Sequence, residues 1–425
     1  MSELPSGWME TILGEVATII NGGTPSTKNI SYWGDDISWI TPKDLSRQKT
    51  KYINKGEKSI TTIGLEKSSA RLLPRNTILF TSRAPIGYVT IAKQKLTTNQ
   101  GFKNIITDEI NTHFIFMYYW LINNAPYIEK QSSGSTFSEA STSLMKSLNI
   151  KLPSIKEQKA IANILSSFDN KIELLKEQNR TLEALSQAIF KEWFVDFNYP
   201  NATGEMISSE IGNIPKGWRV FKLKELVDTI NGYSYKGKEL VEQSNEALVT
   251  LKSFNRNGGF QTRGFKPFRG TPKSQQEVVI GDLIVAHTDL TQDAEVLGNP
   301  AFVFENAGFS KMYITMDLVK VVAKIDDIDN AFLYYTMKDR RFKGHCVGYS
   351  NGTTVLHLSK KAIPEYKIAL PEDLKLAKEF SKLVYSFTNK ISNNIIQIQT
   401  LQKTRDTLLP KLMSGKLRVK GFEDD

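Results

Sequence analysis

The feature that most constrains this chain is an internal repeat. Leu4-Pro5-Ser6-Gly7-Trp8 returns 210 residues later as Ile214-Pro215-Lys216-Gly217-Trp218. Further matches follow in the same order, and the offset grows only to 219, where Asn170-Lys171-Ile172 meets Asn389-Lys390-Ile391. Self-similarity at one long spacing indicates a duplicated structural unit. We therefore expect two related halves of about 210 residues each.

The two copies agree at their ends and differ in between. Residues 24–110 and 234–325 align poorly, although the segments on either side of them match. A shared frame with a different filling is expected of two modules that bind different targets. Neutral drift would give the same pattern, so the difference by itself is only suggestive.

Each copy has a strand-rich part followed by a long helix. Short runs of β-branched and aliphatic residues, such as 16–20, 77–80, 88–91, 283–285 and 318–322, alternate with Gly, Pro and Asn and predict strands. Short amphipathic helices are expected near 113–123 and 331–340. Long helices are expected from about 155 to 194 and from about 374 to 413, with Pro153 and Pro371 just ahead of them. The predicted fold class is α+β.

Both long helices carry a heptad pattern. Seam residues alternate at spacings of four and three, which predicts a coiled coil, and two related helices in one chain most simply pair antiparallel. Self-association into a homodimeric coiled coil is the alternative. A polar residue interrupts each seam; it either fixes register or lies partly exposed. The seam positions are Phe168, Ile172, Leu175, Asn179, Leu182 and Ile189, and Phe387, Ile391, Asn394, Ile398, Leu401 and Leu408.

Charge favours a polyanionic partner. The 425 residues include 55 Lys and Arg against 45 Asp and Glu, a net charge of +10 with a pI near 9.2. The stretch from Lys252 to Lys273 holds six basic residues and no acid, with four phenylalanines interleaved. Basic side chains neutralise DNA phosphates, and arginine can read guanine. The competing interpretation is a solvated loop with its phenylalanines anchored in the core.

Polar turns complete the set of candidate DNA contacts. Asparagine and glutamine suit adenine, and several such residues follow predicted strands, although each one alone is more typical of an ordinary turn. In the first copy the candidates are Thr24, Ser26, Lys28, Lys43, Arg47, Lys49, Ser82, Arg83, Asn99 and Gln100. In the second copy they are Tyr233, Tyr235, Lys252, Asn255, Arg256, Arg263, Lys266, Arg269, Lys273, His287 and Thr288.

The sequence holds two incomplete matches to the motifs of enzymes and no complete one. Asn299-Pro300-Ala301-Phe302 is similar to the Asn-Pro-Pro-Phe loop of adenine methyltransferases but lacks the second proline. Residues 232–238 follow the spacing of a phosphate-binding loop, but Glu239 stands where Ser or Thr is needed for magnesium. The four histidines show no metal-ligand spacing with each other or with Cys346. We expect no catalytic residue and no metal site.

The compartment is expected to be the cytoplasm. Cys346 is the single cysteine, so no intrachain disulfide can form, which fits a reducing interior. The first residues lack the charged and apolar regions of a signal peptide. The most apolar run, 114–122, is shorter than the roughly 20 residues that span a bilayer.

The chain resembles the specificity subunits of type I restriction–modification systems over essentially its whole length. The resemblance rests on the paired openings, on Asn21-Gly22-Gly23-Thr24-Pro25-Ser26 and on Ile37-Ser38-Trp39-Ile40. The most specific match is Leu152-Pro153-Ser154-Ile155-Lys156-Glu157-Gln158, which is similar to the family's Pro-x-x-x-Glu-Gln helix entry. The helix ends at 188–194 and 408–415 match as well. The second copy lacks Glu-Gln after Pro371, so the resemblance implies a different partner contact there.

The resemblance implies two target-recognition domains, 1–153 and 210–372, each reading half of a split DNA site. It implies spacer helices at 154–198 and 373–415 that set the gap between the halves, a linker at 199–209 and a tail at 416–425. It also implies a chain without chemistry of its own, with two modification subunits and restriction subunits as partners. S-adenosylmethionine, ATP and magnesium would be bound by those partners. The alternatives are a self-contained adenine DNA methyltransferase and a coiled-coil scaffold that does not bind DNA.

Overall fold

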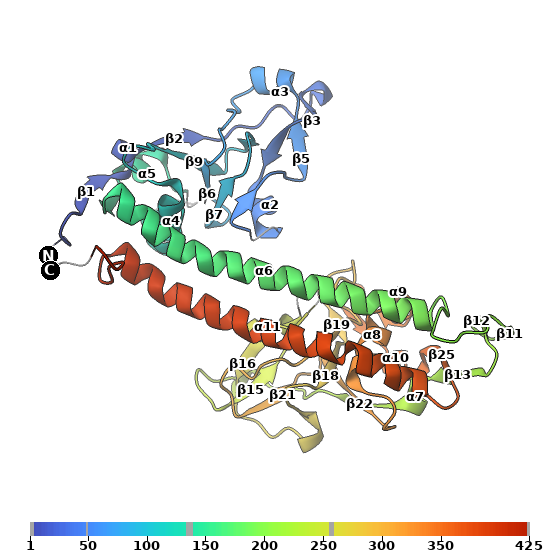
Figure 1. Cartoon of the computed structure of the whole chain (residues 1–425). Helices are drawn as coiled ribbons and strands as arrows, with labels where there is room; N and C mark the ends of the chain where they lie inside the picture. Colours follow the sequence, from blue (N-terminus) through green and yellow to red (C-terminus); the bar gives the residue numbers. More distant parts are fainter. Residues whose placement is uncertain (1–3, 48–49, 133–138, 255–258, 423–425) are drawn as a thin grey trace. The chain divides into compact units, whose positions relative to one another are not determined.

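The computed structural model describes residues 4–47, 50–132, 139–254 and 259–422. The chain forms two compact units, one of Met1–Glu173 with Gln399–Asp425 and one of Leu174–Ile398. Each unit holds one strand-rich domain and a part of both long helices (Figure 1).

The first unit is built on two sheets and a short strand pair. β1 (Met9–Ile12) pairs antiparallel with β10 (Asn149–Leu152). The larger sheet has the order β2 (Ala17–Asn21), β9 (Phe102–Thr107), β6 (Ile78–Ser82), β7 (Ile86–Ala92), β4 (Tyr52–Ile53). The smaller sheet has the order β5 (Lys58–Ile60), β3 (Trp33–Ile40), β8 (Thr97–Thr98). The helices are α1 (Leu13–Val16), η1 (Ile30–Tyr32), α2 (Pro42–Arg47), α3 (Thr62–Glu66), α4 (Phe114–Gln131) and α5 (Thr142–Ser147).

The second unit repeats this plan with a different outer part. Its strand-rich domain begins with a hairpin of β11 (Met206–Ser209) and β12 (Gly212–Pro215). The next strand, β13 (Trp218–Lys222), pairs antiparallel with β25 (Lys367–Pro371). Its sheets have the orders β14 (Val227–Asn231), β22 (Leu318–Ala323), β18 (Leu283–Ala286), β20 (Pro300–Phe302); β16 (Phe265–Pro267), β15 (Glu246–Val249), β21 (Lys311–Ile314), β17 (Glu277–Val278); and β19 (Thr288–Asp289), β24 (Leu356–Leu358), β23 (Ser350–Asn351). The helices are α7 (Leu223–Leu226), η2 (Gly237–Glu239), η3 (Leu251–Ser253), η4 (Thr262–Gly264), η5 (Ser274–Gln276), α8 (Asn330–Lys338), α9 (Arg340–Gly348) and α10 (Ala362–Glu365).

Backbone hydrogen bonds show that the sequence repeat is a structural repeat. Leu13 N donates to Leu148 O at 2.9 Å, and 210 and 218 residues later Leu223 N donates to Tyr366 O at 2.9 Å. The strands β2, β9, β6 and β7 of one unit thus correspond to β14, β22, β18 and β20 of the other. The α+β class and the duplicated topology are confirmed.

The two long helices are α6 (Ile155–Phe194) and α11 (Lys375–Met413), and they pair antiparallel inside each unit (Figure 1). In the first unit Arg405 donates to Asp169 at 2.6 Å. In the second, Asn394 Nδ2 donates to Asn179 Oδ1 at 2.8 Å, and the Phe190 and Phe380 rings lie 5.6 Å apart. All twelve predicted seam residues are buried or half-buried.

The Glu-Gln pair at the start of α6 lies inside the fold. Glu157 is 2% exposed and accepts from Trp8 Nε1 at 3.2 Å and from Arg418 Nε at 2.8 Å. Gln158 is fully buried and bonds to the backbone of residues 111, 113 and 153. We expected the absence of Glu-Gln after Pro371 in the second copy to alter a contact with a partner. Because Glu157 and Gln158 are buried in the first copy, this absence instead changes the internal packing.

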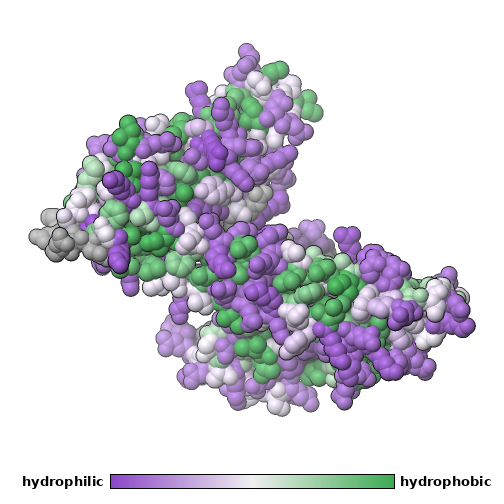
Figure 2. All heavy atoms as spheres, viewed as in Figure 1, coloured by the Kyte–Doolittle hydropathy of each residue, from purple (hydrophilic) through white to green (hydrophobic). Residues whose placement is uncertain are grey.

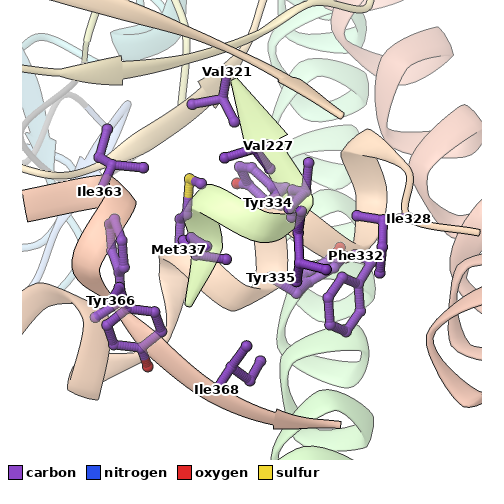
Figure 3. Packing of buried hydrophobic residues seen from close by; sticks show 14 of the residues in the cluster. Val227, Val321, Ile328, Phe332, Tyr334, Tyr335, Met337, Ile363, Tyr366 and Ile368 are labelled. Atoms are coloured by element: carbon purple, nitrogen blue, oxygen red, sulfur yellow. The ribbon is translucent and has the colours of Figure 1, made fainter. Parts of the chain in front are cut away.

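Each unit has its own hydrophobic core, and the core includes its share of α6 and α11. In the second unit Phe332, Tyr334 and Tyr335 of α8 lie among Val227 of β14 and Val321 of β22 (Figure 3). Hydrophilic side chains cover most of the visible face of both units (Figure 2). Among the described residues, no helix combines the length and apolar character needed to cross a membrane.

Candidate nucleic-acid interface

In the first unit, three of the predicted polar turns leave the larger sheet at the same end. The strand register places Asn21 opposite Lys103, Thr81 opposite Phe102 and Ser82 opposite Ile86. The turns at 22–28, 82–83 and 99–101 therefore meet there. We call this end of the β2–β9–β6–β7–β4 sheet, and the equivalent end of the β14–β22–β18–β20 sheet, the loop end.

Close backbone contacts hold these turns together. A Cβ on Gly22 would lie 1.8 Å from Asn99 O, so no larger residue fits at that point. Gly23 N donates to Thr98 O at 2.9 Å, and the Thr24 hydroxyl donates to the side-chain carbonyl of Gln100. Gln100, Ser26 and Lys28 are exposed, whereas Thr24 and Asn99 are half-buried.

The loop end of the second unit is built in the same way. The register places Asn231 opposite Val319 and Ala286 opposite Leu318. A Cβ on Gly232 would lie 2.1 Å from Thr315 O, so this glycine packs against the 315–317 segment in the same way as Gly22 packs against Asn99. The segments 232–236, 287–289 and 315–317, of which the second includes β19, therefore meet at this end.

One hydrogen bond fixes how the two sets of turns correspond. Ser82 N donates to Gly101 O at 2.8 Å, and His287 N donates to Asp317 O at 2.7 Å. Ser82 thus stands where His287 stands in the other unit. Burial, helped by nearby His357, lowers the pKa of His287, which favours its neutral imidazole.

Charged residues that sequence reasoning missed also lie at the first loop end. Glu139 accepts from Lys103 Nζ at 3.1 Å and from Ser82 Oγ at 3.4 Å, and Arg83 is 4.0 Å away. A carboxylate can accept from cytosine N4, so Glu139 is itself a candidate base contact. The repeat offset of 218 pairs Glu139 with His357, but His357 was not among the predicted contacts, so the alignment did not point to Glu139.

The second unit adds two buried polar groups beside its turns. Thr288 Oγ1 donates to Asp317 Oδ1 at 3.1 Å. Asp289 Oδ2 accepts from Val296 N at 2.6 Å. Burial alone would raise the pKa of Asp289, but its backbone and side-chain hydrogen bonds hold it below the usual value. These hydrogen bonds fix the conformation of the 287–289 segment at the loop end.

The basic stretch of the second unit has its phenylalanines inside and its charges outside. Phe254 and Phe268 are buried. Lys252, Arg263, Arg269 and Lys273 are exposed and Lys266 is half-buried, and within the described chain none of the five has a carboxylate within 4.0 Å. The buried phenylalanines agree with the interpretation as a solvated loop anchored in the core, and contact of the exposed cations with phosphates stays a prediction.

This stretch lies against the 232–240 loop. Arg269 N donates to Glu239 O at 2.8 Å, and the Tyr233 hydroxyl donates to Glu239 Oε1 at 2.7 Å. Lys266 Nζ lies 5.7 Å from the Tyr235 ring centre. The cations therefore adjoin the loop that follows β14.

The basic cluster of the first unit is partly neutralised. Lys43 and Arg47 lie 3.1 and 3.0 Å from Glu57, and their charge and hydrogen bonding, led by Lys43, lower the pKa of that carboxyl. Lys49, Asn255 and Arg256 lie outside the described residues.

The two motifs that are similar to those of enzymes make hydrogen bonds within the fold. Asn299 Oδ1 accepts from Lys343 Nζ at 2.9 Å, and Glu239 accepts from the backbone of Lys236. In the part of the chain that the structure describes, no group of three or more His, Cys, Asp or Glu could hold a metal ion.

Comparison with known proteins decides the family. The type I restriction modification DNA specificity domain matches this chain twice, at residues 5–184 and 215–399. The chain belongs to this family. The two matches begin 210 residues apart, which is the offset of the repeat, and each covers one strand-rich domain with most of one long helix.

Some type I specificity subunits are similar to the chain over nearly their full length. The type I restriction enzyme MjaIX specificity subunit of Methanocaldococcus jannaschii is 35% identical over 99% of this chain and 95% of its own. The HindI specificity subunit of Haemophilus influenzae is 24% identical over 97% and 100%. The crystal structure of a type I S subunit from M. genitalium shares the fold, with a TM-score of 0.56 and 18% identity over 95% of this chain and 96% of that one.

Proposed function

We propose that this chain is the DNA-specificity subunit of a type I restriction–modification complex. It reads a two-part DNA target, one part with each strand-rich domain, here called a reader. The first reader is the strand-rich domain of the first unit and the second reader that of the second. It has no catalytic site of its own, and it acts on DNA in the cytoplasm.

The observation that carries this proposal is the pair of loop ends. The same strands, glycine contacts and hydrogen bonds build both frames, yet the exposed Gln100 and Glu139 on one are replaced by the exposed Met316 and His357 on the other. Two copies of one frame that present different hydrogen-bonding groups suit the recognition of two different base sequences. The exposed cations Lys252, Arg263, Arg269 and Lys273 of the second reader would supply contacts to phosphates.

The partners follow from the family. Two modification subunits would methylate adenine with S-adenosylmethionine, and restriction subunits would supply ATP-driven translocation and cleavage with magnesium. The antiparallel helices would dock the modification subunits and act as a ruler for the unread gap. In this assignment the cofactors belong to the partner subunits, and this chain supplies only the choice of sequence.

The test is methylome sequencing of cells that carry this chain with its modification subunits. We expect one adenine-methylated motif in two parts separated by a fixed number of unspecified base pairs. A control strain carries the modification subunits alone and should lack the motif. A continuous motif, or no methylation that depends on this chain, would contradict the proposal. Methylation by the chain without partners would favour the self-contained methyltransferase.

A further inference from the structure

The loops before β9 and β22 are anchored to the same neighbouring strands. Asn99 N donates to Ile40 O at 2.9 Å, and Thr315 N donates to Val249 O at 3.0 Å. Ile40 is the last residue of β3 and Val249 the last residue of β15, and the two residues are 209 positions apart in the sequence. Asn99 and Thr315 therefore hold the same place in the two readers.

The other side of each loop is anchored as well. Gly101 O and Asp317 O accept the equivalent bonds from the β6 and β18 turns, as described above. One residue separates the two anchors in each loop, Gln100 in the first reader and Met316 in the second. These two side chains thus project from the same point of the same frame.

The chemistry at this point differs completely between the readers. Gln100 is exposed and carries an amide, with its oxygen held by Thr24. Met316 is 53% exposed, and its backbone N donates to Tyr233 O at 3.0 Å, which fixes the loop while the thioether faces solvent. A thioether donates no hydrogen bond and accepts only weakly, but it makes good apolar contacts.

An exposed apolar side chain among polar turns offers a target no strong hydrogen bond, but it can pack against an apolar feature of that target. The thymine methyl group is the apolar feature that the major groove presents, next to the donors and acceptors of the bases. We infer that Met316 contacts the methyl group of a thymine in the half-site of the second reader, at the point where the first reader presents the Gln100 amide. This inference rests on the proposed function.

Replacement of thymine by deoxyuridine tests it, because only the methyl group is removed. The assembled complex with modification subunits is titrated with duplexes carrying the mapped motif, in which each thymine is replaced in turn. We expect one thymine in the half-site read by residues 210–372 at which the replacement weakens binding about fourfold, the effect of one buried methyl group.

Variants connect that thymine with Met316. Met316→Ala should bind the thymine and deoxyuridine duplexes equally well at that position, whereas Met316→Leu should keep the preference. Met9→Ala is the matched control, because Met9 is 55% exposed on β1 and should change nothing.

Two results contradict the inference in different ways. If sequence-dependent binding is intact but the deoxyuridine effect is absent, or persists in Met316→Ala, the role of Met316 is wrong and the proposed function stands. If all duplexes bind equally whatever their sequence, the proposed function itself fails.

Discussion

At the scale of single residues, Lys51 shows how the first reader is fixed to the helices of its own unit. Lys51 Nζ lies 2.6 Å from Ser166 Oγ of α6 and 3.3 Å from the Tyr119 hydroxyl of α4. Burial lowers the pKa of Lys51 to about 8, although the nearby Asp169 carboxylate acts in the opposite direction. The folded unit therefore favours the neutral amine more than the unfolded chain does.

This shift predicts a pH dependence of stability. The unfolded chain binds more protons at Lys51 between pH 8 and 10.5, so this residue's contribution to the free energy of unfolding rises with pH through that window. Below pH 8 the charged form carries the full burial penalty. Lys51→Met keeps the apolar stem and should remove the dependence.

The measurement compares melting temperatures of the wild type and Lys51→Met from pH 7 to 10. The wild type should gain on the variant as pH rises. Lys28→Met, at an exposed lysine, is the control and should follow the wild type. Parallel curves for the wild type and Lys51→Met would mean that Lys51 has an ordinary pKa in the fold.

At the scale of elements, the polar pair in the helix seam replaces apolar packing with a specific hydrogen bond. Asn394 is 1% exposed and bonds Asn179 across the two helices of the second unit. Asn394→Leu should lower the free energy of unfolding by about 1–3 kcal/mol, since it leaves Asn179 without its buried partner. Changing both residues to Leu should recover or exceed the wild-type urea midpoint. An unchanged midpoint in Asn394→Leu would contradict a role for the pair.

The start of α6 allows one copy to be rebuilt as the other. At the repeat offset of 219, Glu157 and Arg418 correspond to Leu376 and Tyr199, and Tyr199 packs 5.0 Å from the Trp218 ring. Glu157→Ala leaves the Arg418 charge, which is 12% exposed, without this carboxylate. It should therefore cost about 3 kcal/mol.

The double variant Glu157→Leu with Arg418→Tyr should recover much of that loss, because it installs the apolar arrangement of the second copy. Urea unfolding followed by tryptophan fluorescence reports both variants, since Trp8 contacts Glu157. If the double variant is as unstable as Glu157→Ala, the two copies are not equivalent at this point.

Sequence alone predicted the elements well and their neighbours poorly. Heptad spacing places both long helices, because 3.5-residue periodicity is a local signal. The short helix expected to end near residue 123 continues to Gln131, and the one after 331 breaks at Asp339 into α8 and α9. Strand order is not a local property, so the meeting of the 22–28, 82–83 and 99–101 turns could not be predicted, and Glu139 was missed for the same reason.

At the scale of the whole molecule, the unit boundaries show where the helices can be lengthened. They fall between Glu173 and Leu174 and between Ile398 and Gln399. Seven residues inserted at both places keep the heptad seam and leave the contacts within each unit intact.

Under the ruler hypothesis this double insertion adds about 10 Å of helix, or roughly three base pairs of DNA, to the gap. Methylome sequencing should show both half-sites unchanged with a longer gap. An insertion in one helix alone is the control and should abolish methylation, because it shifts the pairing of the two helices by one heptad. A change in half-site sequence at constant gap would refute the ruler.

Exchange of one reader tests the central claim most directly. Residues 210–372 are replaced by the corresponding segment of a family member with a different target, and the methylated motif is read from the genome. The account predicts that one half of the motif changes while the other half and the gap stay as they were. A motif that changes in both halves, or in neither, would contradict the claim that each reader recognises its own half-site.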